Sequence, residues 1–145
     1  MMKLQRFLLI IVGLALASSA RADLIWHTDL AAAKVQAAKE GKQLLLEFTG
    51  SDWCFYCQKL DDEVLSTEAF ADHAQHFVLV RLDYPQKKIL PAAEKRQNET
   101  LEAQFKIEGF PTVILCDAAG HELHRATGYD PEKGPKAYLL ELFGK

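Results

Sequence analysis

The segment QLLLEFTGSDWCFYCQKL, residues 43–60, holds two of the three cysteines in this chain and decides how its middle folds. Its first seven residues, Gln43 to Thr49, form a short apolar run that is typical of a buried strand. Residues 50–52 are turn formers, and the residues after them show a helical pattern. Cys54 and Cys57 therefore lie where a strand and a tight turn lead into a helix.

The position of the two cysteines at a helix start predicts reactive chemistry. The first N–H groups of a helix have no partner inside the helix, and the helix dipole favours negative charge there. A cysteine at this point is stabilised as a thiolate. Cys54 should be the more exposed of the two, and we expect it to be the nucleophile. Cys57 lies one turn further in, where it can attack a mixed disulfide formed at Cys54 and release the product.

Two other interpretations of the pair stay open. A structural zinc site needs four ligands, but the sequence has no second Cys-x-x-Cys. His121 and His124 have a suitable interval, but on an expected strand they would face opposite sides. A static disulfide would close a very small loop and gain little chain entropy. We therefore favour a redox pair and expect it to work without a metal or other cofactor.

The rest of the chain predicts alternating helices and strands in one domain. A helix is expected from Leu30 to Glu40, with Asp29 as its N-cap. Later elements are a helix near residue 67, a strand over 76–84, weakly marked helices over 92–96 and 99–105, a strand over 112–116, its hairpin partner over 122–127, and a helix over 136–143. This order predicts an α/β fold with a central mixed sheet flanked by helices on both faces.

The first residues have the features of a secretory signal. Two basic residues precede an apolar run from Phe7 to Ala17, and Ala20 to Ala22 supplies small residues where a signal peptidase cuts. The apolar run is well short of the roughly 20 residues that span a bilayer, which favours a cleaved signal over a membrane anchor. We expect a signal peptide over 1–22, a domain over 23–145, and a periplasmic or secreted protein.

Charge narrows the range of partners. Cleavage would remove three of 17 basic residues and none of the 20 acidic ones, which leaves a formal net charge of −6. Such a balance argues against nucleic acid or an anionic membrane as a partner. We expect a monomer without stable membrane insertion after cleavage. The charged residues 61–63 and 87–88 are expected to be solvated surface.

Cys116 is the odd cysteine in a chain expected to be exported. Cysteines in oxidising compartments are usually paired, so an odd number leaves at least one over. Cys116 ends an apolar run, and we expect it to be a small core residue. A reactive thiol that pairs with another molecule is the alternative.

Three stretches together resemble the thioredoxin family. They are WCFYC at residues 53–57, the strand LLLEF before it, and GFPT at residues 109–112. The longer segment over residues 48–64 is similar to exported bacterial thioredoxin-like proteins whose active-site turn reads Gly-Ser-Asp-Trp-Cys. The resemblance extends from about Trp26 to the C-terminus. It implies a thioredoxin fold and a protein thiol–disulfide oxidoreductase.

The resemblance also implies roles for single residues. Cys54 would be the nucleophile and Cys57 the resolving thiol. Pro111 would be a cis-proline that faces the pair, and the backbone beside it, at Phe110, would pair with an extended substrate segment. Trp53 would shield the sulfur atoms, although a large ring in this place also serves for packing.

Glu47 is the one acid inside the apolar strand before the cysteines. Thioredoxins carry a buried acid in this strand that helps to move the proton of the resolving cysteine. Here the acid is Glu rather than Asp, and the turn is longer by one residue. Burial would raise its pKa and let it act as a base towards Cys57. The alternative is a carboxylate that faces solvent.

Phe55 and Tyr56 depart from the Gly-Pro that common thioredoxins carry between the cysteines. The two rings offer an apolar, stacking surface that suits unfolded or aromatic-containing protein segments. The residues between the cysteines also help to set the reduction potential, which spans about −270 to −120 mV in proteins of this kind.

The sequence therefore predicts an enzyme that exchanges protein disulfides through Cys54 and Cys57. We favour a reductase or isomerase-type role, maintained by a membrane-bound or thioredoxin-type electron donor. The alternatives are a periplasmic dithiol oxidase and a non-catalytic module that binds extended peptides in the proline groove. The intact cysteine pair argues against the module, because a binding protein needs neither thiol.

Overall fold

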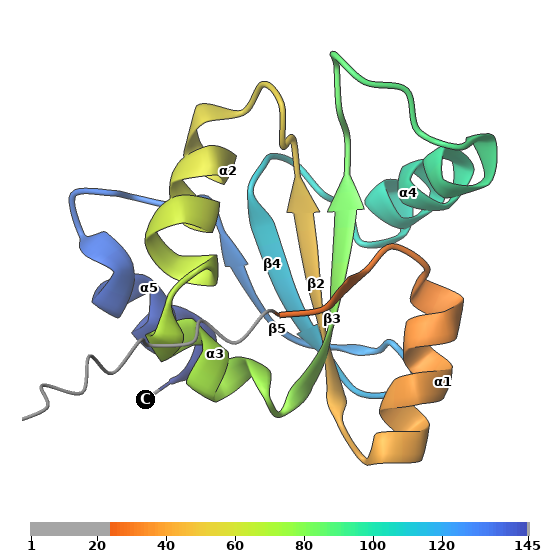
Figure 1. The fold of residues 1–145 in the computed structure, drawn as a ribbon, viewed down its shortest axis with the longest axis horizontal. Helices are drawn as coiled ribbons and strands as arrows, with labels where there is room; N and C mark the ends of the chain where they lie inside the picture. The colour runs from red at the N-terminus through yellow and green to blue at the C-terminus, as the bar shows by residue number, and fades with distance from the viewer. Residues whose placement is uncertain (1–23, 145) are drawn as a thin grey trace, which may run out of the picture.

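A computed structural model describes residues 24–144, so the signal peptide expected over residues 1–22 lies outside the described residues. The described chain forms a mixed five-stranded sheet with the order β1-β3-β2-β4-β5 (Figure 1). The strands are β1 (Trp26–His27), β2 (Gln43–Thr49), β3 (Phe77–Asp83), β4 (Thr112–Cys116) and β5 (Glu122–Thr127). β1, β3 and β2 run parallel, while β4 is antiparallel to β2 and β5 is antiparallel to β4.

Helices cover both faces of this sheet, which confirms the predicted α/β architecture. They are α1 (Leu30–Glu40), α2 (Phe55–Leu60), its π-helical continuation η1 (Asp61–Leu65), α3 (Glu68–Ala74), α4 (Ala92–Gln104) and α5 (Gly134–Phe143). Figure 1 shows α1 and α4 on one face and α2, α3 and α5 on the other. In the part of the chain described, no helix combines the length and the apolar character needed to cross a membrane.

The central strand β2 is apolar because it is buried on both faces. Successive side chains of a strand point to opposite sides. Leu44, Leu46 and Phe48 pack into the core under α1 and α4, whereas Leu45 packs into the core under α2, η1, α3 and α5. Glu47 shares the face of Leu45, so a carboxylate enters an otherwise hydrophobic layer.

Local signals fix the ends of the first helix. The Asp29 side chain accepts a hydrogen bond from the Ala32 N–H at 3.1 Å, as an N-cap should. Gly41 ends the helix with φ of 65°, a left-handed conformation that glycine adopts without steric cost. The Asp29 N-cap and the helix bounds are those predicted from the sequence.

Three parts of the fold differ from that prediction. The two weakly marked helices predicted over 92–96 and 99–105 form one continuous helix, α4, whose exposed polar surface hides its periodicity because only Asn98 and Leu101 are buried. β1 has two residues, too few for a recognisable pattern. The helix after the cysteines continues as the π-helical turn η1, in which the partly exposed Asp61 and Glu63 also contact Arg81 and Tyr129.

Candidate active site

Cys54 and Cys57 form a disulfide at the point where β2 delivers the chain to α2. Cys54 is the N-cap of α2, and its Sγ accepts a hydrogen bond from the Cys57 N–H at 3.2 Å. Cys54 is 6% exposed and Cys57 is 1% exposed, so both are buried and Cys54 is the nearer to solvent. An N–H aimed at a sulfur atom favours the thiolate form when the disulfide is reduced.

The turn before Cys54 requires a glycine. A Cβ atom at Gly50 would lie 2.5 Å from the Trp53 ring, a distance that real Cβ contacts essentially never reach. The absence of a side chain lets the indole lie over the turn. The Gly50 N–H in turn points to Cys57 Sγ, with 3.4 Å between nitrogen and sulfur. Both sulfur atoms therefore receive a backbone N–H.

The Phe110–Pro111 segment faces the cysteine pair from the start of β4. Its peptide bond is cis, as the thioredoxin resemblance implied. The Phe110 carbonyl oxygen lies 3.8 Å from Cys54 Sγ. The ring of Phe110 meets the Trp53 ring edge-on, with 6.1 Å between the ring centroids. The structure thus brings Cys54, Trp53, Phe110 and Pro111 together, although they come from two distant parts of the chain.

Phe55 and Tyr56 form a separate exposed surface on the first turn of α2. Both side chains are more than half exposed, and their rings pack edge to face with centroids 5.3 Å apart. The Lys59 ammonium lies 5.9 Å from the centroid of the Phe55 ring. These aromatic rings contact one another and Lys59 rather than Phe110, so they flank Cys54 on the helix side.

Glu47 is buried, and a basic group from the neighbouring strand compensates its charge. Glu47 lies opposite Arg81 in the parallel pairing of β2 and β3, and Arg81 Nε donates to its Oε2 at 2.6 Å. Burial raises the pKa of the Glu47 carboxyl to about 7, and the Arg81 guanidinium acts against this rise. The same guanidinium donates from Nη2 to Asp61 Oδ1 at 2.6 Å.

Glu47 and Cys57 line one small pocket of about 220 Å³. Its other lining residues are Thr49, Ser51, Gln58, Asp61, Asp62 and Arg81. The pocket joins the resolving side of the disulfide to the Glu47–Arg81–Asp61 chain of ion pairs. The buried Glu47 carboxyl and Cys57 therefore border the same small space.

Sequence reasoning missed Arg81 and Asp61. Arg81 carries the same signal as Glu47, a charge inside an apolar strand, and reading the two strands together would have found the pair. Asp61 gave no such signal. It lies in a run of acids that we expected to be solvated, and its ion pair depends on the path of η1.

Replacing Arg81 with methionine should raise the pKa of Glu47 further, above its wild-type value of about 7. The positive charge that opposes desolvation is then gone, whereas the burial remains. The carboxyl carbon resonance of Glu47, followed by NMR across pH, measures this shift directly. Asp61→Asn is the matched control with the opposite sign, because the Asp61 charge raises the Glu47 pKa. A lower Glu47 pKa in Arg81→Met would contradict this description of the site.

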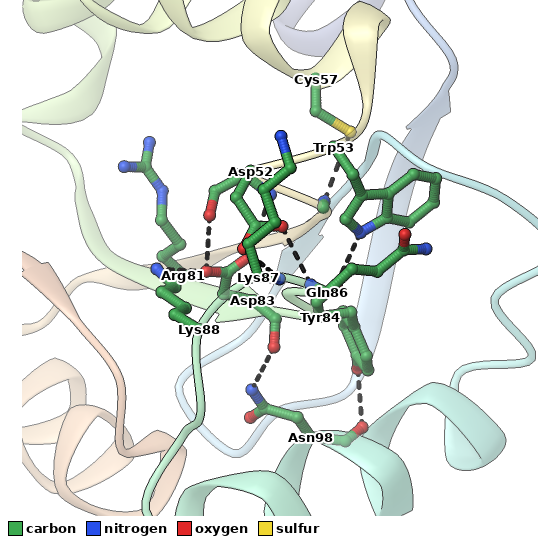
Figure 2. A network of polar contacts seen from close by, with 12 residues as sticks. Asp52, Trp53, Cys57, Arg81, Asp83, Tyr84, Gln86, Lys87, Lys88 and Asn98 are labelled. Atoms are coloured by element: carbon green, nitrogen blue, oxygen red, sulfur yellow. Dashed lines mark hydrogen bonds and ion pairs between the residues drawn. The ribbon is translucent and has the colours of Figure 1, made fainter.

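A second polar network holds the active-site turn to the end of β3 (Figure 2). Asp83 is buried, and its carboxylate accepts from the Ser51 N–H at 3.0 Å and from Ser51 Oγ at 2.7 Å. Lys88 Nζ lies 2.7 Å from the same carboxylate. These contacts keep the pKa of Asp83 below its usual range despite desolvation. Asp83 therefore stays ionised and fixes the turn that carries Gly50.

Cys116 lies in the core, and His121 and His124 each contact a nearby oxygen atom. Cys116 is fully buried in the core, as expected, and burial raises the pKa of its thiol to about 12. His121 Nδ1 lies 2.9 Å from Asp117 Oδ2, and His124 Nε2 lies 2.8 Å from the Glu141 carbonyl oxygen. The two imidazoles thus have different partners.

Comparison with known proteins agrees with this geometry. Residues 30–142 match the family described as thioredoxin-like domain. The disulfide bond reductase DsbH of Chlamydia pneumoniae is 38% identical over 124 residues, which are 85% of this chain and 73% of DsbH. The thioredoxin-related protein DsbJ of the same organism is 33% identical over 114 residues, 77% of this chain and 32% of DsbJ.

Solved structures show the same fold. The DsbH oxidoreductase aligns with a TM-score of 0.74 at 34% identity, covering 95% of this chain and 88% of that one. The C-terminal domain of Neisseria meningitidis DsbD, in its oxidised form, aligns with a TM-score of 0.55 at 20% identity over 81% of this chain and 99% of that one. The chain therefore belongs to the thioredoxin-like family, and it is a thiol–disulfide oxidoreductase with a Cys54-x-x-Cys57 pair.

Proposed function

We propose that this protein reduces disulfide bonds of other proteins outside the cytoplasm, cycling Cys54 and Cys57 between dithiol and disulfide. The observation that carries this proposal is the disulfide at the N-cap of α2, which faces the Phe110 carbonyl and is backed by a buried acid. The similarity to DsbH, which is named a disulfide bond reductase, favours the reducing direction.

The first half of the cycle uses Cys54. In the reduced protein the Cys57 N–H, which contacts Cys54 Sγ, stabilises the Cys54 thiolate. The thiolate attacks one sulfur atom of the substrate disulfide, and the other substrate sulfur leaves as a thiolate and takes up a proton. A mixed disulfide now joins Cys54 to the substrate.

The second half uses Cys57 and Glu47. The Cys57 thiol transfers its proton towards the ionised Glu47 carboxylate through the pocket that both residues line. The Cys57 thiolate then attacks Cys54 Sγ and forms the intramolecular disulfide, and the second substrate thiolate is released. Two electrons have passed to the substrate. The Gly50 N–H helps to stabilise the Cys57 thiolate during this step.

Five further residues form the proposed substrate surface around Cys54. The backbone of Phe110, beside cis-Pro111, lies next to Cys54 Sγ, where it can pair with the backbone of an extended substrate segment. Trp53 covers the turn on one side, and Phe55 and Tyr56 offer exposed rings on the other. Aromatic rings contribute a large apolar contact area to such binding.

The partners of this oxidoreductase are proteins that carry thiols or disulfides. We propose that the regenerating partner is a membrane-bound or thioredoxin-type electron donor, because an oxidising compartment would otherwise leave the pair as a disulfide. The proposed signal over residues 1–22 directs the domain over 23–145 to the periplasm or the exterior. The negative charge leaves nucleic acid outside the range of partners, and we expect a monomer.

An insulin-reduction assay tests the proposal. With dithiothreitol as electron donor, the protein should accelerate the precipitation of insulin chains, and Cys54→Ser should reduce the rate to that of the donor alone. Cys116→Ala is the matched control and should keep full activity, because Cys116 is buried opposite Leu44, at the other end of β2 from the pair. Binding of unfolded peptides without any reduction of insulin would instead support the non-catalytic module.

A further inference from the structure

The loop between β3 and α4 forms a pocket of about 290 Å³ that the proposed cycle does not use. Its apolar lining comes from Tyr84, Pro85, Ile89 and Leu90. Ile89 is 99% exposed, so this side chain at the pocket edge has almost no contact with the rest of the protein. Single exposed apolar residues are common on protein surfaces, but one at the edge of an apolar pocket suits the binding of another molecule.

Contacts between aromatic rings link the pocket to the active site. The Phe110 carbonyl oxygen lies 3.8 Å from Cys54 Sγ, and the Phe110 ring lies 4.9 Å from the ring of Tyr84 between centroids. Tyr84 lines the pocket. The Trp53 indole N–H donates to the Tyr84 carbonyl oxygen at 2.8 Å, so Tyr84 also contacts the active-site turn. A substrate segment bound at Cys54 can therefore extend along these rings towards the pocket.

The loop is held in place before any partner arrives. The Asp52 carboxylate accepts from the Gln86 N–H at 2.9 Å and from the Lys87 N–H at 2.8 Å (Figure 2). At the base, Asn98 Nδ2 donates to the Asp83 carbonyl at 2.9 Å. The active-site turn and the pocket loop thus form one connected unit. A preformed pocket binds a side chain without the cost of ordering the loop first.

The charges around the pocket are already compensated. Of its charged lining residues, Lys88 pairs with Asp83 and Lys95 pairs with Glu99. Each ammonium group therefore has its carboxylate partner, and the pocket presents no uncompensated charge to an incoming group. A charged side chain would lose hydration here and gain no ion pair, whereas an apolar side chain would bury its surface against Ile89, Leu90 and Tyr84.

We propose that this pocket is a specificity subsite that takes one large apolar side chain of the protein substrate, a few residues from the cysteine under attack. The inference rests on the proposed disulfide exchange with proteins. In this role the β3–α4 loop selects substrates by their sequence, whereas the two cysteines perform the reaction. Small disulfides that do not reach the pocket are reduced without its help.

Two disulfide-linked peptides and one small disulfide test the subsite. The peptides differ only in having leucine or serine at each position within four residues of the cysteine, and hydroxyethyl disulfide serves as the small substrate. The wild-type protein should reduce the leucine peptide with a kcat/KM about tenfold higher, the size expected for burying one apolar side chain. Ile89→Asp should abolish this preference and leave the rate with hydroxyethyl disulfide unchanged.

Val35→Asp is the matched control, because Val35 is also an exposed apolar residue, 72% exposed, but lies on α1. It should keep the leucine preference. Equal rates of the wild type with both peptides, or a loss of the small-disulfide rate in Ile89→Asp, would overturn the subsite and leave the proposed function standing. A wild type that reduces none of the three substrates would overturn the proposed function and the subsite with it.

Discussion

Cys57→Ser is expected to stop the cycle at the mixed disulfide and to accumulate a covalent complex with substrate. Cys54 keeps the Cys57 backbone N–H beside its sulfur in this variant, because that contact does not involve the replaced side chain. Attack on the substrate disulfide can therefore proceed, but no thiol remains to release the product. Non-reducing gel electrophoresis and intact-mass measurement should show the adduct, with turnover lower by at least about a hundredfold.

Cys54→Ser is the counterpart that separates the two roles. It removes the more exposed sulfur, and Cys57 is almost completely buried, so this variant should form little adduct with a folded substrate. The pattern contradicting our assignment is the reverse one, with abundant adduct in Cys54→Ser and little in Cys57→Ser. Cys57 would then be the attacking residue.

Glu47→Gln is expected to lower turnover by about a hundredfold near pH 7.5, the lower end of the usual effect of a general base. The pKa of Glu47 is about 7, so the carboxyl is protonated at pH 6 and largely ionised at pH 8. Wild-type turnover should rise across this interval as the base form appears. Glu47→Gln should lack this rise in turnover between pH 6 and pH 8. The difference in turnover between the variant and the wild type should become smaller at higher pH, where the Cys57 thiol ionises without a base.

A control variant and a stability measurement separate the role of Glu47 from the general effect of removing an acid. Glu63→Gln changes an acid of η1 that contacts Tyr129 and Lys59 and does not line the Glu47 pocket, and it should leave the pH profile unchanged. Folding provides an independent readout. Because the pKa of Glu47 is higher in the folded than in the unfolded chain, stability should fall as pH rises from about 4.5 to about 7, and Glu47→Gln should remove this dependence. A variant with the wild-type pH profile of turnover would exclude Glu47 as the base.

The sequence predicted those parts of the fold and site that depend on local pattern. β2 and the start of α2 were predictable because an apolar strand, a turn and a helix N-terminus follow one another within 18 residues. The burial of Glu47 followed from its apolar neighbours. The approach of Phe110 and Pro111 to Cys54 was implied by the thioredoxin resemblance, since no local pattern joins segments so far apart.

The remaining features depend on strand register and on loop paths. Arg81 meets Glu47 because β2 and β3 pair in one particular register, which periodicity alone does not specify. Asn98 lies in a helix with a mostly polar surface, so its buried bond to the Asp83 carbonyl gave no signal. The pocket at Ile89 is lined by the loop that follows β3, whose backbone Asp52 binds. Such contacts between distant backbone and side-chain groups become visible only in the structure.

The reduction potential of the Cys54–Cys57 couple tests the proposed reductase most directly. Equilibration with graded dithiothreitol or glutathione buffers, followed by the fluorescence of Trp53 beside the pair, gives this potential. We predict a value near the reducing end of the known range, about −270 mV. A value near −120 mV, where strong oxidants lie, would contradict the reductase and assign the opposite direction of electron flow.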